Sequence, residues 1–214
     1  DNLDTVGVPT THANPQGLDL KPKVSSTVHV LLEEAGGVLV GKVRMDTITF
    51  QSEGTLRPVG CFNPWDTTVS PGTSSSGPGS ATAASLCLGS VGTDSGGSVR
   101  HPAANCGVVG MRATIGRISR YPIDSFPASG IQSAAGPLTK TVEDNAIMLR
   151  ILGVYDPKYP ISINEPTDDY PAQLGIGVKG VRIGVPTDDW IWKKWITEEH
   201  EDRVRKAISI LEEK

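Results

Sequence analysis

Two clusters of serine and glycine, separated by a stretch of small and apolar residues, constrain the fold of this chain most. The first cluster covers residues 71–80 (PGTSSSGPGS) and the second covers residues 92–100 (GTDSGGSVR). Glycines let the backbone approach a ligand closely and leave N–H groups outside sheet pairing. Successive free N–H groups bind anions, and a hydroxyl beside them adds a nucleophile to an oxyanion hole. The clusters therefore predict a site for acyl transfer.

The segment between the clusters, residues 80–88 (SATAASLCL), predicts a helix that packs closely against its neighbours. Such a helix is roughly 14 Å long, and the glycine-rich loop expected over residues 91–99 is long enough to bring the chain back. Ser74 and Ser98 can then meet at one end of a sheet. A flexible Gly/Ser linker is the alternative, but such linkers lack structured apolar flanks, so the pattern favours a site.

The remaining sequence predicts alternating helices and strands, which are typical of an α/β fold. Thr141 and Asp144 fit a capping box at the start of one helix. Both ends of the chain lack a cap or regular start, so we expect them to be cuts through a larger domain. Helices are expected over residues 25–35, 141–152 and 198–214, strands over 38–40 and 181–185, and irregular chain over 1–24, 51–73 and 155–175.

Composition excludes several classes of protein. The 214 residues are 37% hydrophobic with a net charge of −4 and no long run of one sign, so we expect no nucleic acid to be bound directly and no membrane association. Without a signal-peptide pattern, a cytoplasmic protein is expected. The three cysteines form no C-x-x-C pair, which disfavours a disulfide framework and a zinc site. We expect the cysteines to be unpaired.

Three other motifs are incomplete. Residues 36–43 approach a P-loop, but Val43 stands where Ser or Thr should bind the metal. Residues 175–180 match G-x-G-x-x-G, but they precede an expected strand instead of a helix. The residues around Ser98 do not match the nucleophile elbow G-x-S-x-G, and Asp94 is interpreted as a carboxylate that shapes the loop. Lys42 is a possible base, but a structural or surface lysine is the favoured interpretation.

Five ordered blocks resemble the amidase signature family. They are residues 41–46 (GKVRMD), 63–66 (NPWD), 71–77 (PGTSSSG), 92–117 (GTDSGGSVRHPAANCGVVGMRATIGR) and 136–144 (GPLTKTVED). The similarity runs from residue 1 to about residue 155 and continues weakly to residue 185. It implies an α/β fold with a mixed, twisted sheet covered by helices. Residues 1–214 would then be part of a single domain, with a catalytic core of about residues 25–155.

The resemblance implies a Ser–cis-Ser–Lys catalytic unit. Ser98 matches the nucleophile, and Ser74 matches the bridging serine that follows a cis peptide bond. The positions that match the oxyanion and substrate-binding loop, together with the Ser98 amide, are Ser95, Gly96 and Gly97. The positions that match supporting residues are Ser75, Thr93 and Arg100. Residues 48–50 are expected to form one wall of the acyl pocket. No metal or cofactor is implied.

The sequence departs from the family pattern in its first cluster, where Thr73 and Ser76 replace glycines and Pro78 is unusual. The family's catalytic lysine precedes an Asp-Asn pair, and this chain opens with Asp1 and Asn2. We therefore expect the lysine directly before Asp1 in a parent chain, and we expect the 214 residues alone to be inactive.

The implied activity is hydrolysis of the C–N bond of a small-molecule amide through an acyl-serine intermediate, in a protein that is a possible homodimer. The A subunit of tRNA-dependent amidotransferases shares the block at residues 116–121 (GRISRY). Residues 130–135 lack the acidic residue expected in that protein, so a general amidase is favoured. A non-catalytic binding or assembly member of the same fold is the other alternative.

Overall fold

The computed structural model describes residues 2–13, 18–19, 21–46, 61–122, 132–185 and 197–214. The chain separates into two compact units, Asp1–Ala172 and Gln173–Lys214. The serine clusters and the expected catalytic core of residues 25–155 both lie in the first unit.

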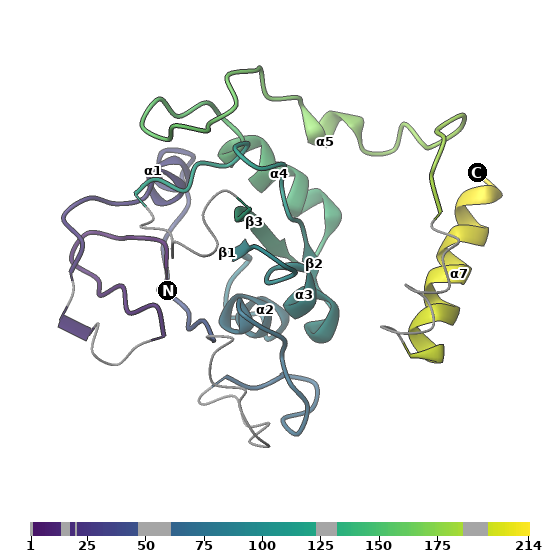
Figure 1. Cartoon of the computed structure of the whole chain (residues 1–214), viewed down its shortest axis with the longest axis horizontal. Coiled ribbons are helices and arrows are strands. Elements are labelled where there is room, and N and C mark those ends of the chain that lie inside the picture. The colour runs from purple at the N-terminus through teal and green to yellow at the C-terminus, as the bar shows by residue number, and fades with distance from the viewer. Residues whose placement is uncertain (1, 14–17, 20, 47–60, 123–131, 186–196) are drawn as a thin grey trace. The chain divides into compact units, whose positions relative to one another are not determined.

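A small antiparallel sheet forms the centre of the first unit (Figure 1). Strand β3 (Ala134–Thr139) lies between β1 (Gly89–Asp94) and β2 (Val109–Gly110), and Asp94 pairs with Ala134 at the end of β1. The sheet and its helices agree with the expected α/β class.

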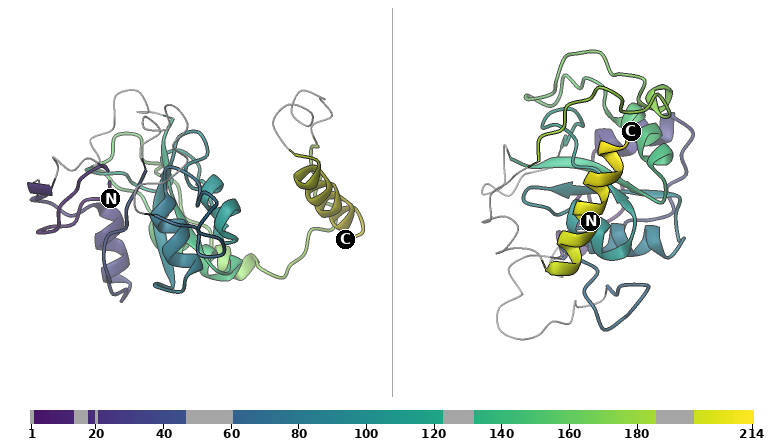
Figure 2. Two further views of the ribbon diagram at one scale, coloured as in Figure 1. Left: turned by 90° about the horizontal axis from the view of Figure 1, so that it is seen from below. Right: turned by 90° about the vertical axis from the view of Figure 1, so that its right-hand side faces the viewer.

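Helices cover both faces of this sheet, as the views in Figures 1 and 2 show. Helix α4 (Val142–Leu152) packs on β3 and against α1 (Thr27–Glu34). Helices α2 (Ser76–Ala83) and α3 (Arg100–Cys106) contact each other and the opposite face of the sheet. The first unit is thus a three-layer arrangement, with both serine clusters on the α2–α3 side.

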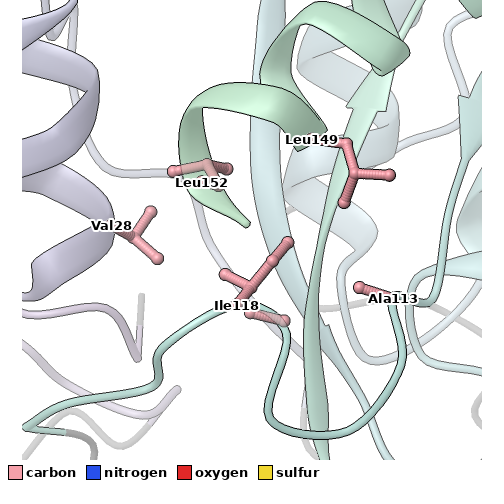
Figure 3. Packing of buried hydrophobic residues seen from close by; sticks show 6 residues of the cluster. Val28, Ala113, Ile118, Leu149 and Leu152 are labelled. Carbon is pink, nitrogen blue, oxygen red and sulfur yellow. The ribbon is translucent and has the colours of Figure 1, made fainter. Parts of the chain in front are cut away.

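The main core lies between the sheet, α1 and α4. Figure 3 shows Val28 of α1 with Leu149 and Leu152 of α4 around the buried Ile118. Alternate residues of β3 divide between the faces: Ala135 belongs to this core, whereas Leu138 packs with Val99 and Ala103 of the other layer.

Local sequence signals position the helix ends. Ser26 caps α1 by accepting a hydrogen bond from the His29 amide, and Gly36, with a φ of +88°, follows the helix. Thr141 Oγ1 accepts from the Asp144 amide at 3.0 Å, which confirms the predicted cap of α4. The last helix, α7, covers Glu198–Glu212 within the second unit and is capped by Thr197.

The predictions of two strands are wrong. Residues 38–40 and 181–185 have no strand structure, and the side chains of Val38 and Val40 are 86% and 75% exposed. A run of apolar residues forms a strand only when a second strand accepts its hydrogen bonds. Neither segment has such a partner within the described ranges.

The stretch between the clusters also differs from expectation. The helix begins at Ser76 and ends at Ala83, so it starts inside the first cluster, and Leu86 and Leu88 beyond it are exposed. The loop expected over residues 91–99 begins as strand β1, because residues 89–94 pair with a segment distant in sequence. The irregular connector of residues 155–175 contains a single short helix, α5 (Tyr170–Gln173).

Within the described ranges, no helix combines the length and apolar character needed to cross a membrane.

Candidate active site

The first serine cluster occupies the start of helix α2. Ser75 is the N-cap residue, and the peptide bond between Thr73 and Ser74 is cis, as the family resemblance implies. The Ser74 carbonyl accepts a hydrogen bond from the Asp46 amide at 2.9 Å, and the Arg44 carbonyl accepts one from Gly77 at 3.0 Å. Residues 44–46 therefore run beside the cluster and hold its backbone.

The second cluster covers the end of β1, the loop that follows and the first residue of α3, directly beside the first cluster. The Ser75 amide donates to the Ser98 carbonyl at 3.0 Å, and Ser75 Oγ donates to the Thr93 carbonyl at 3.4 Å. Ser74 and Ser98 are each 9% exposed. The predicted meeting of the two clusters is confirmed by these hydrogen bonds.

Asp94 organises the loop that carries Ser98. Its fully buried carboxylate accepts hydrogen bonds from the amides of Gly97, Val99 and Arg100 at 2.7, 3.1 and 3.3 Å. The Arg100 guanidinium adds two bonds of 3.0 Å, one to each oxygen. Asp94 therefore shapes the loop, as predicted, and the positive charge of Arg100 neutralises the Asp94 carboxylate.

The same contacts set the protonation of Asp94. Burial raises the pKa of this carboxyl, but the Arg100 side chain and the three amides outweigh burial and lower the pKa to about 2. Asp94 is therefore ionised over the whole neutral range.

This depressed pKa predicts an acid-sensitive loop. The ordinary pKa is 3.8, so the Asp94 interactions contribute fully above that pH and are lost as the pH falls from about 4 to about 2. We expect the stability lost to be about 2 kcal/mol. Urea unfolding at several pH values should show a steeper loss for the wild type than for Asp94→Asn. Equal pH dependence of the two proteins over this range would contradict the assignment.

The backbone of the loop leaves amides beside Ser98 without an acceptor. Gly97 has a φ of +125°, which favours glycine, and its amide is taken by Asp94. The amides of Gly96 and Ser98 donate to no acceptor in the part of the chain that the structure describes. An ideal Cβ on Gly96 would meet nothing within 4 Å, so the space beside this residue is open. Two free amides next to a hydroxyl fit an oxyanion hole.

Close packing of the two clusters depends on Gly92. A Cβ at this position would lie 2.4 Å from Ser75 Oγ and 2.8 Å from Ser75 Cβ. We expect Gly92→Ala to displace Ser75 and to destabilise the protein by about 1–3 kcal/mol in urea unfolding. Gly96→Ala is the matched control for stability, since its added methyl group has free space. Equal midpoints for Gly92→Ala and the wild type would show that the clusters are not tightly packed.

Three contacts of the site come from residues that sequence reasoning missed. The Asn2 side chain donates to Thr93 Oγ1 at 2.8 Å, Ser133 Oγ lies 2.7 Å from Ser95 Oγ, and Arg112 lies 3.4 Å from Asp94 Oδ1. All three are distant in sequence from the clusters. No local pattern could have identified them.

Lys42 makes contacts with the N-terminal segment instead of with the serine clusters. Its Nζ donates to the Pro9 carbonyl at 2.9 Å and to Thr10 Oγ1 at 2.5 Å. Burial lowers the pKa of Lys42, and Asp4 partly opposes this effect. Lys42 thus ties the N-terminal segment to residues 41–46, which fits the structural interpretation.

The three cysteines, Cys61, Cys87 and Cys106, are unpaired, and burial raises the pKa of the Cys106 thiol. Among the described residues, no group of three or more His, Cys, Asp or Glu side chains could hold a metal ion. Residues 48–50, the expected wall of an acyl pocket, lie outside the described ranges.

Comparison with known proteins agrees with this geometry. The family model described as Amidase matches residues 1–214. The A subunit of the glutamyl-tRNA(Gln) amidotransferase of Desulfatibacillum aliphaticivorans is 40% identical over 216 residues, which cover 99% of this chain and 43% of that protein. The chain thus spans less than half the length of the curated relatives it matches.

Solved structures show the same fold. The crystal structure of the glutamyl-tRNA(Gln) amidotransferase A subunit from Thermotoga maritima has a TM-score of 0.86 at 34% identity, covering 99% of this chain and 46% of that one. A peptide amidase in complex with chymostatin has a TM-score of 0.81 at 26% identity, covering 99% of this chain and 44% of that one. The sequence and the fold together show that this chain belongs to the amidase signature family.

Proposed function

We propose that the full-length protein hydrolyses amide C–N bonds through an acyl-serine intermediate on Ser98. The observation that carries this proposal is the hydrogen bond from the Ser75 amide to the Ser98 carbonyl, which joins the two serine clusters. This bond brings Ser75, the residue after Ser74, into contact with Ser98, the residue that would be acylated. The buried Asp94 holds the Ser98 loop with its free amides, as an acyl-transfer site requires.

In the proposed mechanism, Ser98 Oγ attacks the amide carbonyl carbon while Ser74 accepts the Ser98 proton and passes its own proton to a lysine. The amides of Gly96 and Ser98 bind the oxyanion that forms. Ser74 then donates a proton to the leaving nitrogen and recovers one from the lysine, so that the C–N bond breaks and the amine departs. Water attacks the acyl ester by the same proton route in reverse, which releases the acid and restores Ser98.

We propose that the base in this scheme is a lysine immediately before Asp1, as the family resemblance implies. The hydrogen bond from Asn2 to Thr93 supports this position, because it attaches the N-terminal segment to strand β1 beside Ser75. A serine hydroxyl is a weak nucleophile without such a base. Lys42 is bonded to Pro9 and Thr10 and is a poor substitute.

For the substrate, a small linear amide is our first proposal and the glutamine amide is the second. The second is favoured by one observation, the 40% identity to the A subunit of an amidotransferase over 99% of the chain. In that case, the protein would act in the cytoplasm with partner proteins that receive the ammonia. The absence of an acidic residue from residues 130–135 favours the first proposal.

The test is an assay of the full-length protein with two probes, a small chromogenic anilide and L-glutamine with detection of ammonia. Release of the chromophore supports a general amidase. Release of ammonia from glutamine, without turnover of the anilide, supports the amidotransferase. Turnover of neither probe, with no labelling of Ser98 by a fluorophosphonate, would contradict the proposed activity and favour a binding or assembly role.

A further inference from the structure

A contact between two hydroxyls joins the Ser98 loop to the start of strand β3. Ser95 Oγ and Ser133 Oγ lie 2.7 Å apart, and Ser133 is 4% exposed. The contact extends the strand pairing by one step, because Asp94 and Ala134 are already opposite each other in the sheet. Ser133 is thus presented to Ser95 from a fixed register.

Two arginines fix the backbone from which Ser133 projects. Arg120, which is 5% exposed, donates to the Ser133 carbonyl at 3.0 Å. Arg112 donates to the Gln132 carbonyl at 2.7 Å and to the Asp94 carbonyl at 3.3 Å, so it connects both sides of the contact. Hydrogen bonds from a charged donor are stronger than neutral ones, and both arginines therefore restrict the movement of this segment.

The loop between Asp94 and Ser98 has few other attachments. The Asp94 carboxylate holds Gly97 and the two residues after Ser98. Ser95 and Gly96 have no further hydrogen bond within the described ranges than the one to Ser133. The end of the loop that includes the free Gly96 amide therefore depends on this single contact.

We propose that Ser133 is a positioning residue for the reaction: its hydroxyl holds Ser95 and thereby fixes the Gly96 amide, which binds the oxyanion together with the Ser98 amide. The inference rests on the proposed function, since it assigns to Ser133 a part in the same site. Donors that are fixed before the reaction stabilise the transition state without a reorganisation cost. Loss of the contact should therefore lower kcat and leave substrate binding almost unchanged.

The test compares Ser133→Ala, Ser95→Ala and the double variant in the full-length protein. The matched control is Ser90→Ala, which removes a β1 hydroxyl that donates to the Pro78 carbonyl at 3.0 Å. Two readouts are needed: kcat and KM for amide hydrolysis, and hydrogen exchange of the Gly97 amide, which is bonded to Asp94 within the same loop. Exchange of this bonded amide reports how often the loop opens, whether or not the protein is active.

We expect Ser133→Ala to lower kcat about five- to tenfold and to speed exchange of the Gly97 amide by a similar factor, with KM changed less than about twofold. Ser95→Ala removes the same contact from the other side and should give the same acceleration of exchange, and the double variant should be no worse. Ser90→Ala should change neither readout.

Unchanged kcat and exchange in Ser133→Ala would overturn the inference. Effects that multiply in the double variant, or the same losses in Ser90→Ala, would also overturn it. If the wild type hydrolyses no amide, the proposed function fails, and the exchange data still decide whether Ser133 holds the loop.

Discussion

Replacing Ser98 with alanine in the full-length protein should lower the rate of amide hydrolysis at least about 10³-fold, because no other group can take over as the nucleophile. Ser98 Oγ makes no hydrogen bond to another described residue, so the melting temperature should stay close to that of the wild type. The measurement is the initial rate with a chromogenic amide, together with labelling by a fluorophosphonate probe that phosphonylates active serines.

The labelling experiment separates Ser98 from its neighbours. Mass spectrometry of the labelled wild type should locate the probe on Ser98, and Ser98→Ala should take up none. Ser95→Ala is a useful comparison because its hydroxyl lies in the same loop but is bonded to Ser133. Labelling that persists in Ser98→Ala would show that a different serine is acylated.

Replacing Ser74 with alanine should lower the rate by about 10²–10³-fold, since the proposed route for the proton from Ser98 passes through this hydroxyl. The effect should fall on kcat, with KM nearly constant, because Ser74 acts in the chemical step. The Ser74 carbonyl accepts a hydrogen bond from the Asp46 amide, and the substitution retains this bond. The measurement is steady-state kinetics with the same chromogenic amide.

Ser76 provides the matched control for Ser74. It lies in the same cluster and is fully buried, and its hydroxyl has no hydrogen-bond partner among the described residues. Ser76→Ala should therefore retain most of the activity. Near-normal turnover in Ser74→Ala, together with a large loss in Ser76→Ala, would move the proton-transfer role to Ser76.

The sequence alone determined what depends on near neighbours. Ser26 and Thr141 cap two helices that the sequence predicted, because a hydroxyl needs only an amide three residues away. The two serine–glycine clusters were also identified without a structure, and so was the role of Asp94. Glycines leave backbone amides free, and a nearby carboxylate can accept hydrogen bonds from them.

Tertiary contacts decided the rest. Strand β3 contains Pro137, which has no N–H to donate, so local propensity argues against a strand in the centre of a sheet. Its carbonyl nevertheless accepts from the Met111 amide and the Asn145 side chain, both supplied by other segments. Residues 38–40 show the opposite case, an apolar run that forms no strand within the described ranges.

The candidate active site also depends partly on local sequence and partly on tertiary contacts. Residues 71–80 and 92–100 carry the chemistry in their sequence, but the hydrogen bond from Ser75 to Ser98 exists only because β1 returns the chain beside α2. The contact of Ser95 with Ser133 likewise depends on the antiparallel register of β1 and β3. A sequence contains the groups available for catalysis, whereas the strand register decides which of them come within hydrogen-bonding distance.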